Sequence, residues 1–125
     1  KYTQPQIMKM LAGYGGCQAL LGIKDMKEIS RRAEAGEEPY REVLEAMLYT
    51  VSKQIGAMAV ALWGKAEAII LTGGIAYSKY CVEEIRKQVE FLAPVVVLPG
   101  EGEMESLAFN ALGALNGELP IHEYK

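Results

Sequence analysis

The sequence predicts an α/β fold in which helices pack on a short, mainly parallel sheet. Apolar side chains recur at helical spacing over residues 40–62, which corresponds to roughly six turns of one long helix. Two runs, residues 68–71 and 95–98, are apolar without alternation, as is typical of parallel strands that are covered on both faces. With 125 residues, 50% hydrophobic and 23% charged, the chain has the balance of one globular domain.

The N-terminal third predicts two helices separated by an ambiguous segment. Gln4–Leu11 has the pattern of a short helix with Pro5 in its first turn, where a missing N–H group costs least. The apolar run 17–21 fits either a strand or a buried turn, and we expect the strand. Asp25 stands where it can cap a helix that stops at Gly36. The flanks of this helix are expected in solvent: Arg31, Arg32 and Glu34.

A βαβ unit is the economical interpretation of the following segment. The first strand runs into Gly73 and Gly74, and Ser78 can cap the next helix. Three aliphatic side chains of that helix are expected to point inward: Val82, Ile85 and Val89. Pro94 opens the second strand, and the crossover is expected to be right-handed. A last helix, Glu103–Leu115, is expected to bury one face, formed by Leu107, Ala108, Ala111, Leu112 and Leu115.

Two strands are too few for a self-sufficient sheet. Parallel strands cannot cover each other's edges, and independently stable sheets usually have three or more strands. We therefore expect the missing partners before Lys1 or in another chain, and we expect homo-oligomers or an exposed apolar edge. The absence of a starting methionine likewise favours a piece of a longer protein.

Composition excludes several classes of partner and location. A net charge of -3 and a pI of about 5.2 provide no basic surface for nucleic acid. No apolar run approaches the ~18 residues of a membrane span, and no signal peptide is recognisable, so we expect no membrane partner. Cys17 and Cys81 match neither a CxxC pair nor a dense disulfide framework. A cytoplasmic location fits these features best.

The junction between the first strand and its glycines is the sharpest candidate site. Gly73 and Gly74 permit unusual backbone angles and a close approach of the backbone to a ligand. Free N–H groups at the start of the next helix attract anions, and ligands of open α/β sheets bind outside the carboxyl ends of strands. A nucleotide suits this place. The alternative is a plain turn whose glycines solve a steric problem, and these residues alone favour the turn.

Five segments of the chain, taken in order, closely resemble the C-terminal part of the butyrate kinases of the acetokinase family. They are Lys-Asp-Met-Lys (24–27), Ile-Gly-Ala-Met (55–58), Ala-Ile-Ile-Leu-Thr-Gly-Gly-Ile-Ala-Tyr-Ser-Lys (68–79), Ala-Pro-Val-Val-Val (93–97) and Pro-Gly-Glu-Gly-Glu-Met-Glu-Ser-Leu-Ala (99–108). The resemblance covers nearly the whole chain. It implies part of a ribonuclease-H-like domain of the actin, sugar kinase and heat-shock chaperone ATPase superfamily. Residues 1–125 would be the single C-terminal nucleotide-binding segment of a larger two-domain kinase.

The resemblance also assigns nucleotide-binding residues. The adenosine and α-phosphate side of the site would be lined by Gly73, Gly74, Ile75, Ala76, Tyr77 and Ser78. Asp25, Met26 and Lys27 match a stretch that lies against the base and ribose in acetate kinases. Acetate kinases usually have Arg in place of Lys27 and Gly-Glu-Asn in place of residues 76–78, so backbone contacts are expected more firmly than side-chain contacts. The Ala-Tyr-Ser version points to the butyrate branch.

Acidic residues near the last helix are candidate magnesium ligands. Glu101, Glu103 and Glu105 lie close together in sequence, and carboxylates are usual Mg²⁺ partners beside nucleotide phosphates. Glu103 roughly aligns with an acidic residue tied to the metal in acetate kinases, so we select it as the metal ligand. The alternative is that Glu103 and Glu105 are first-turn carboxylates favoured by the helix dipole.

The activity implied by the resemblance is a phosphoryl transfer from ATP to butyrate, giving butyryl phosphate and ADP, with Mg²⁺. The partners would be the nucleotide and a short-chain fatty acid or its acyl phosphate. The family's phosphate-binding loops, its transition-state arginine and histidine, and most carboxylate selectivity belong to preceding segments. We therefore expect no catalytic residue here and no activity of this segment alone. The alternative is a non-catalytic module that binds nucleotide or a partner protein.

Other reactive or aromatic residues have structural interpretations. His122 is expected in solvent, Trp63 is expected to anchor the core, and Cys81 is expected as a small buried apolar side chain. The methionines expected mainly in the core are Met8, Met10, Met47 and Met58.

Overall fold

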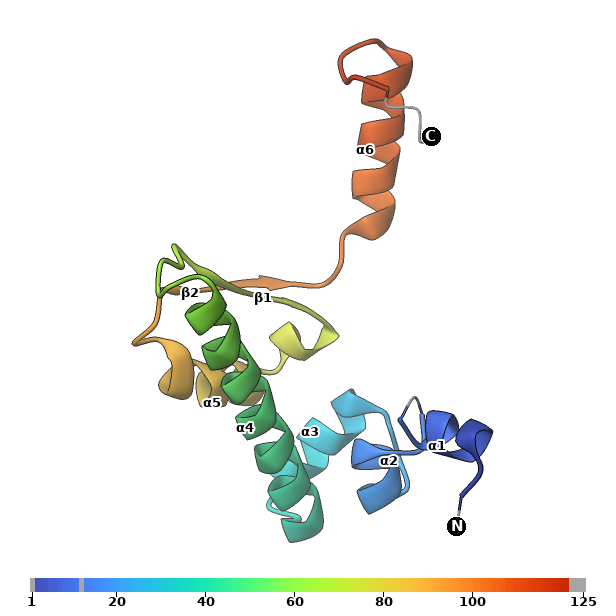
Figure 1. Cartoon of the computed structure of the whole chain (residues 1–125), viewed down its shortest axis with the longest axis vertical. Helices are drawn as coiled ribbons and strands as arrows, with labels where there is room; N and C mark the ends of the chain where they lie inside the picture. The colour runs from blue at the N-terminus through green and yellow to red at the C-terminus, as the bar shows by residue number, and fades with distance from the viewer. Residues whose placement is uncertain (1, 12, 122–125) are drawn as a thin grey trace.

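The computed structural model describes residues 2–11 and 13–121 and combines several helices with one small sheet (Figure 1). In chain order, the elements are α1 (Gln4–Leu11), α2 (Gly16–Leu21), α3 (Met26–Glu34), α4 (Glu38–Ala61), β1 (Ile69–Gly73), the 3₁₀ helix η1 (Gly74–Tyr77), α5 (Lys79–Val89), β2 (Val95–Pro99) and α6 (Glu103–Leu115). None of the helices in the described ranges has the length and apolar character that a membrane crossing requires.

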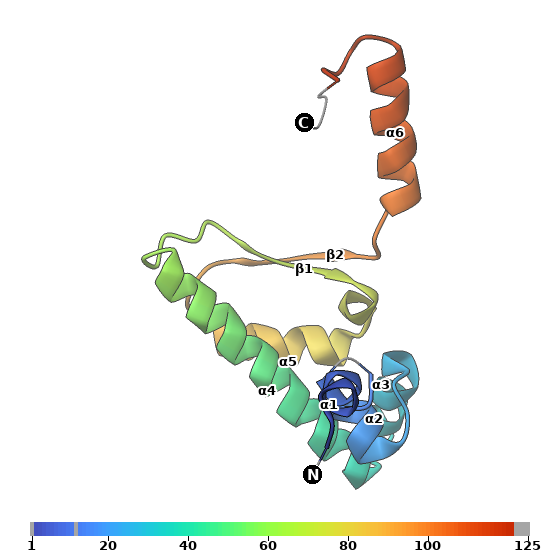
Figure 2. The ribbon, with the colours of Figure 1, turned by 45° about the vertical axis from the view of Figure 1, so that its right-hand side comes forward.

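The sheet of the described chain has two parallel strands, as predicted. Its register places Ile69 opposite Val95 and Gly73 opposite Pro99. Helix α5 connects the strands, so the βαβ unit is confirmed. Figure 2 shows α4 and α5 on one side of the sheet.

The core lies among α3, α4, α5 and β1. Helix α4 packs against α3, α5 and α2. The buried cluster combines side chains from α3, α4, β1 and α5. Its fully or nearly fully buried members are Ile29, Ala33, Leu44, Leu48, Leu71, Cys81, Val82, Ile85 and Val89. The three inward positions predicted on α5 and the burial of Cys81 are therefore confirmed.

The apolar spacing within residues 40–62 predicts that the long helix packs against the sheet through a seam formed by Leu44, Met47, Val51, Ile55 and Met58. This prediction is only partly correct. Leu44 is fully buried, but Met58 is 58% exposed, and the fully buried partner of Leu44 is Leu48. The most buried stripe of α4 thus follows positions four residues apart, and it includes Ser52, whose Oγ donates to the carbonyl of Leu48 at 3.0 Å. The seam was expected against the sheet, whereas the principal neighbours of α4 are helices.

The apolar run at residues 17–21 forms helix α2, so the predicted strand is wrong. Gly22 ends this helix in the left-handed conformation with φ of 73°, and its N–H group bonds to the carbonyl of Gln18 at 3.1 Å. Leu21 and Cys17 pack against the core from this helix. A five-residue apolar run has nearly the same pattern in a short helix and in a strand, which is why periodicity misassigned it.

Helix α6 has the predicted bounds but not the predicted burial. It stands away from the sheet in both views (Figures 1 and 2). All five of its expected inward residues are exposed: Leu107, Ala108, Ala111, Leu112 and Leu115. Gly113 is its one buried residue, and a Cβ atom built there would lie 2.8 Å from the Leu119 side chain.

Several other expected core residues lie at the surface. Trp63 is 88% exposed and has φ of 55°, and three methionines are also exposed, namely Met8, Met10 and Met58. Met47 packs partly buried against the core. His122 lies outside the described residues.

Candidate functional site

A cavity of about 910 Å³ lies between α3 and η1, and we name it the α3–η1 pocket. Its lining is formed by Asp25, Met26, Lys27, Ser30, Arg31, Glu34, Gly74, Ile75, Tyr77 and Ser78. Seven of the nine predicted nucleotide-binding residues are in this lining, although about 50 positions separate the two segments in sequence. Gly73 and Ala76, the other two, belong to the same β1–η1 segment but do not line the cavity.

The first wall of the pocket begins at the end of β1. Gly73 has φ of 75° and ψ of -168°, a conformation that side chains rarely adopt. Gly74 has no positive φ, and a Cβ atom built on it would meet no heavy atom within 4 Å. Gly73 therefore shapes the turn, whereas Gly74 leaves space beside the backbone. Ala76, only 5% exposed, fixes η1 to the body of the domain.

Ser78 ties this wall to its surroundings. Its Oγ accepts a hydrogen bond from the N–H group of Cys81 at 3.2 Å and so caps α5, as predicted. The same hydroxyl donates to Oε1 of Glu34 at 3.3 Å, which joins the two walls of the pocket. Tyr77 is 70% exposed and also lines the cavity.

The second wall is one face of α3. Oδ1 of Asp25 accepts from the N–H group of Lys27 at 3.0 Å, so the predicted N-cap is confirmed. Ser30, Arg31 and Glu34 complete this wall, and sequence reasoning did not assign them to the site. Their spacing from Lys27, three, four and seven positions, could have identified them, because such positions share one face of a helix.

The charges of the α3 wall are neutralised unevenly. Arg31 donates two hydrogen bonds to Glu28, from Nε at 2.8 Å and from Nη2 at 2.7 Å. These bonds lower the pKa of Glu28 below its ordinary value. By contrast, Lys27 and Glu34 enter none of the ion pairs among residues 2–11 and 13–121. The pocket therefore contains one cation, Lys27, and two carboxylates, Asp25 and Glu34, that lie outside these ion pairs.

The predicted metal ligand lies elsewhere. Glu103 is exposed in the first turn of α6 and does not line the α3–η1 pocket. No group of three or more histidine, cysteine, aspartate or glutamate residues in the described part of the chain is placed to hold a metal ion. One carboxylate suits Mg²⁺ only where phosphate oxygens and water complete its shell, as they commonly do in nucleotide sites.

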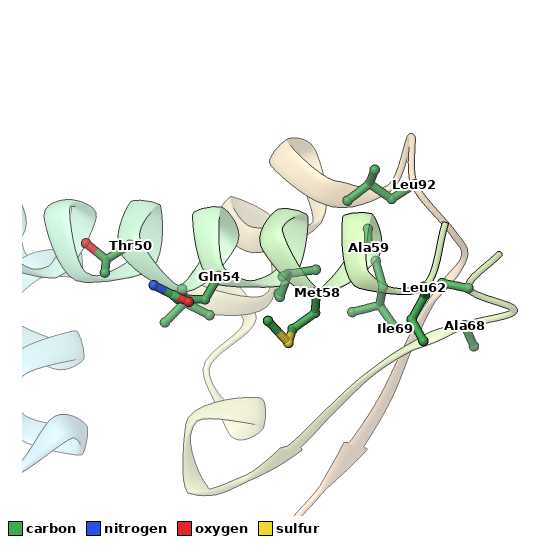
Figure 3. A pocket seen from close by; sticks show the side chains of 11 residues that line it. Thr50, Gln54, Met58, Ala59, Leu62, Ala68, Ile69 and Leu92 are labelled. Atoms are coloured by element: carbon green, nitrogen blue, oxygen red, sulfur yellow. The ribbon is translucent and has the colours of Figure 1, made fainter. Parts of the chain in front are cut away.

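A second hollow has a different chemistry. An apolar groove of about 440 Å³ runs between the C-terminal half of α4 and the start of β1 (Figure 3). Its lining includes Met58, Leu62, Ile69 and Leu92, and its polar members are Thr50 and Gln54. Because no charged side chain lines it, this groove offers neither an acid or base nor a counter-charge for phosphate.

Comparison with known proteins identifies the family. A sequence profile described as the Acetokinase family matches residues 1–97. "Probable butyrate kinase" of Phocaeicola vulgatus is 62% identical and that of Bacteroides thetaiotaomicron is 50% identical, each over all 125 residues and 35% of the relative. "Probable butyrate kinase 2" of Caldanaerobacter subterraneus subsp. tengcongensis is 46% identical over 94% of this chain and 33% of its own length. The chain spans about one third of these relatives, and it belongs to the acetokinase family.

Proposed function

We propose that this chain is the C-terminal, ATP- and ADP-binding segment of a two-domain kinase that phosphorylates a short-chain carboxylate, with butyrate as the substrate. The α3–η1 pocket carries the proposal, because it brings the segments 25–27 and 74–78 together around one cavity. Similarity to proteins named butyrate kinase supports the acceptor and favours a kinase over a non-catalytic module.

In this proposal, the nucleoside lies between α3 and η1. The exposed backbone at Gly74 approaches the α-phosphate, while the methionine and isoleucine of the lining, Met26 and Ile75, provide apolar contact for the base. The segment thereby holds ADP and leaves the terminal phosphate toward the rest of the enzyme.

The overall reaction moves the terminal phosphoryl group of ATP to a carboxylate oxygen of butyrate, which yields butyryl phosphate and ADP. Mg²⁺, when bound with the phosphates, would neutralise part of their negative charge. Glu103 is the ligand that we propose from this chain. Positioning and charge neutralisation dominate such transfers. Residues of the remaining length of the enzyme perform the transfer in this proposal, which assigns no catalytic residue to positions 1–125.

The test uses the full-length protein. Calorimetric titration should show ADP binding, and butyrate with ATP and Mg²⁺ should give an acyl phosphate that hydroxylamine traps as a hydroxamate. Acetate and a branched acid, assayed in parallel, compare the acceptors. Folded protein that binds no ADP would refute the nucleotide site, whereas ADP binding without acyl phosphate formation from any acid would refute the kinase proposal alone.

A further inference from the structure

Glu34 has an unusual place in the α3–η1 pocket. It lies in the last turn of α3, lines the cavity and is exposed to it. Its one side-chain hydrogen bond within the described chain is to the hydroxyl of Ser78, which occupies Oε1 at 3.3 Å. No ion pair of the described residues uses this carboxylate, so Oε2 retains its full capacity to accept hydrogen bonds.

The other charged groups of the lining are Lys27 and Arg31, which carry the opposite sign, and Asp25, which lies at the other end of α3. Asp25 uses Oδ1 to cap α3, and Arg31 is held by two bonds to Glu28. Ser78 contributes its proton to Glu34 and accepts from Cys81. Asp25 and Glu34 are therefore the two carboxylates that the pocket offers to a ligand, and Glu34 is the one that contacts the η1 side of the cavity, through Ser78.

An ionised carboxylate restricts what can lie beside it. A phosphate group is repelled by the like charge, so the phosphates of a nucleotide avoid this end of the cavity. A neutral O–H or N–H donor is attracted, and a hydrogen bond to a charged acceptor is about twice as strong as one between neutral groups. Within a nucleotide, such donors belong to the nucleoside, namely the ribose hydroxyls and the exocyclic amine of the base.

We propose that Glu34 is a specificity-determining residue that accepts a hydrogen bond from a neutral donor of the nucleoside. This inference rests on the proposed nucleotide-binding function and adds an orientation to it. The nucleoside faces the C-terminal end of α3 and Ser78, and the phosphates point away from Glu34. Ser78 is a positioning residue in this arrangement, because its hydroxyl fixes one oxygen of the carboxylate.

The experiment compares four ligands on full-length protein by calorimetric titration: ADP, 2′-deoxy-ADP, 3′-deoxy-ADP and inosine diphosphate, in which a carbonyl replaces the exocyclic amine. Wild-type protein should bind at least one analogue about 10-fold or more weakly than ADP, since loss of a charged hydrogen bond is costly. Glu34→Ala should weaken ADP binding by a similar factor and should no longer distinguish ADP from that analogue. The analogue concerned identifies the donor as a ribose hydroxyl or the amine.

Two further variants make the result decisive. Glu42→Ala removes an exposed carboxylate from α4, outside the pocket, and should retain wild-type ligand ratios. If Glu34→Ala fails to fold by circular dichroism, Glu34→Gln decides, because its amide oxygen can still accept from Ser78 but lacks the charge. Wild-type ratios for all four ligands in the Glu34 variant would overturn this inference while leaving ADP binding intact. Absence of ADP binding in wild-type protein would overturn the nucleotide site and this inference together.

Discussion

Gly73 and Gly100 exchange two backbone hydrogen bonds, each 3.1 Å long, where the carboxyl ends of β1 and β2 meet. The hydroxyl of Thr72 reinforces this junction by donating to the carbonyl of Gly100 at 2.9 Å. Tyr77, which lines the α3–η1 pocket, places its hydroxyl beside the same glycine. The end of β2 is thus coupled to the wall of the pocket, although no residue of β2 lines the cavity.

Replacing Gly100 should therefore affect both stability and ligand binding. Gly100 has φ of 89°, and a Cβ atom there would lie 2.7 Å from the Tyr77 hydroxyl. We expect Gly100→Ala to lower the free energy of unfolding by about 1–2 kcal/mol through backbone strain. The added methyl group should also displace Tyr77 and change ADP affinity, measured by titration of the full-length protein.

Gly117→Ala is the matched control for this variant. Gly117 also has a positive φ, 74°, but a Cβ atom there meets nothing within 4 Å. It should therefore lose comparable stability and keep wild-type ADP affinity. Equal ADP affinities for the two variants would show that the contact between Gly100 and Tyr77 has no influence on the pocket.

The buried stripe of α4 gives a second prediction. Leu48 is fully buried, so Leu48→Ala should cost about 2–5 kcal/mol in denaturant unfolding through lost contacts and a residual cavity. Val60, on the same helix, is 79% exposed, and Val60→Ala should change stability by no more than about 0.5 kcal/mol. Comparable losses in both variants would place the core on the wrong face of α4.

The N-cap of α3 gives a third prediction, because it organises one wall of the pocket. Asp25→Ala removes the acceptor for the Lys27 N–H group and should destabilise the protein by about 1 kcal/mol in thermal or denaturant unfolding. Asp25→Asn retains an oxygen at the same place and should recover most of that loss. If the alanine and asparagine variants are equally destabilised, the cap does not contribute to stability.

Local sequence patterns predicted the helices and strands better than they predicted which faces of those elements are buried. The caps at Asp25 and Ser78 and the parallel strands depend on short-range chemistry, and all were found. Leu107 and Leu115 of α6 were expected inside because periodicity marks an apolar face. Periodicity does not say what covers that face, and both side chains are exposed in the described chain. Trp63 shows the same limit, since its size favours a core position whereas its backbone φ of 55° ends a helix at the surface.

The sequence likewise identified part of the α3–η1 pocket but not all of it. The segment around Gly74 was selected from its strand–glycine junction and by resemblance, and the segment around Asp25 by resemblance alone. The fold places the two on opposite walls of one cavity. Glu34 was expected in solvent and is exposed, but its charge and outward helical position gave no sign of the segment that faces it. Its role depends on Ser78, which lies 44 positions away and comes within hydrogen-bond distance only through tertiary packing.

The glycine pair provides the last prediction, since the two residues have different tasks. Gly73 needs its positive φ, so replacing it should strain the backbone. Gly74 does not, and a side chain there would enter open space in the pocket lining. Gly74→Val should therefore fold and should weaken ADP binding by at least ~10-fold, about 1.4 kcal/mol, because its branched side chain occupies room that the adenosine or first phosphate needs.

Calorimetric titration of full-length Gly74→Val, with circular dichroism and thermal unfolding to establish its fold, separates loss of ligand from loss of structure. Gly73→Ala is the informative companion, because it should lower the unfolding temperature while adding little bulk to the pocket. The opposite ranking, with Gly74→Val misfolded and Gly73→Ala unaffected, would contradict the backbone geometry. If Gly74→Val folds and binds ADP with wild-type affinity, nucleotide does not occupy the space beside Gly74. Gly73 and Gly74 would then serve only to form a turn.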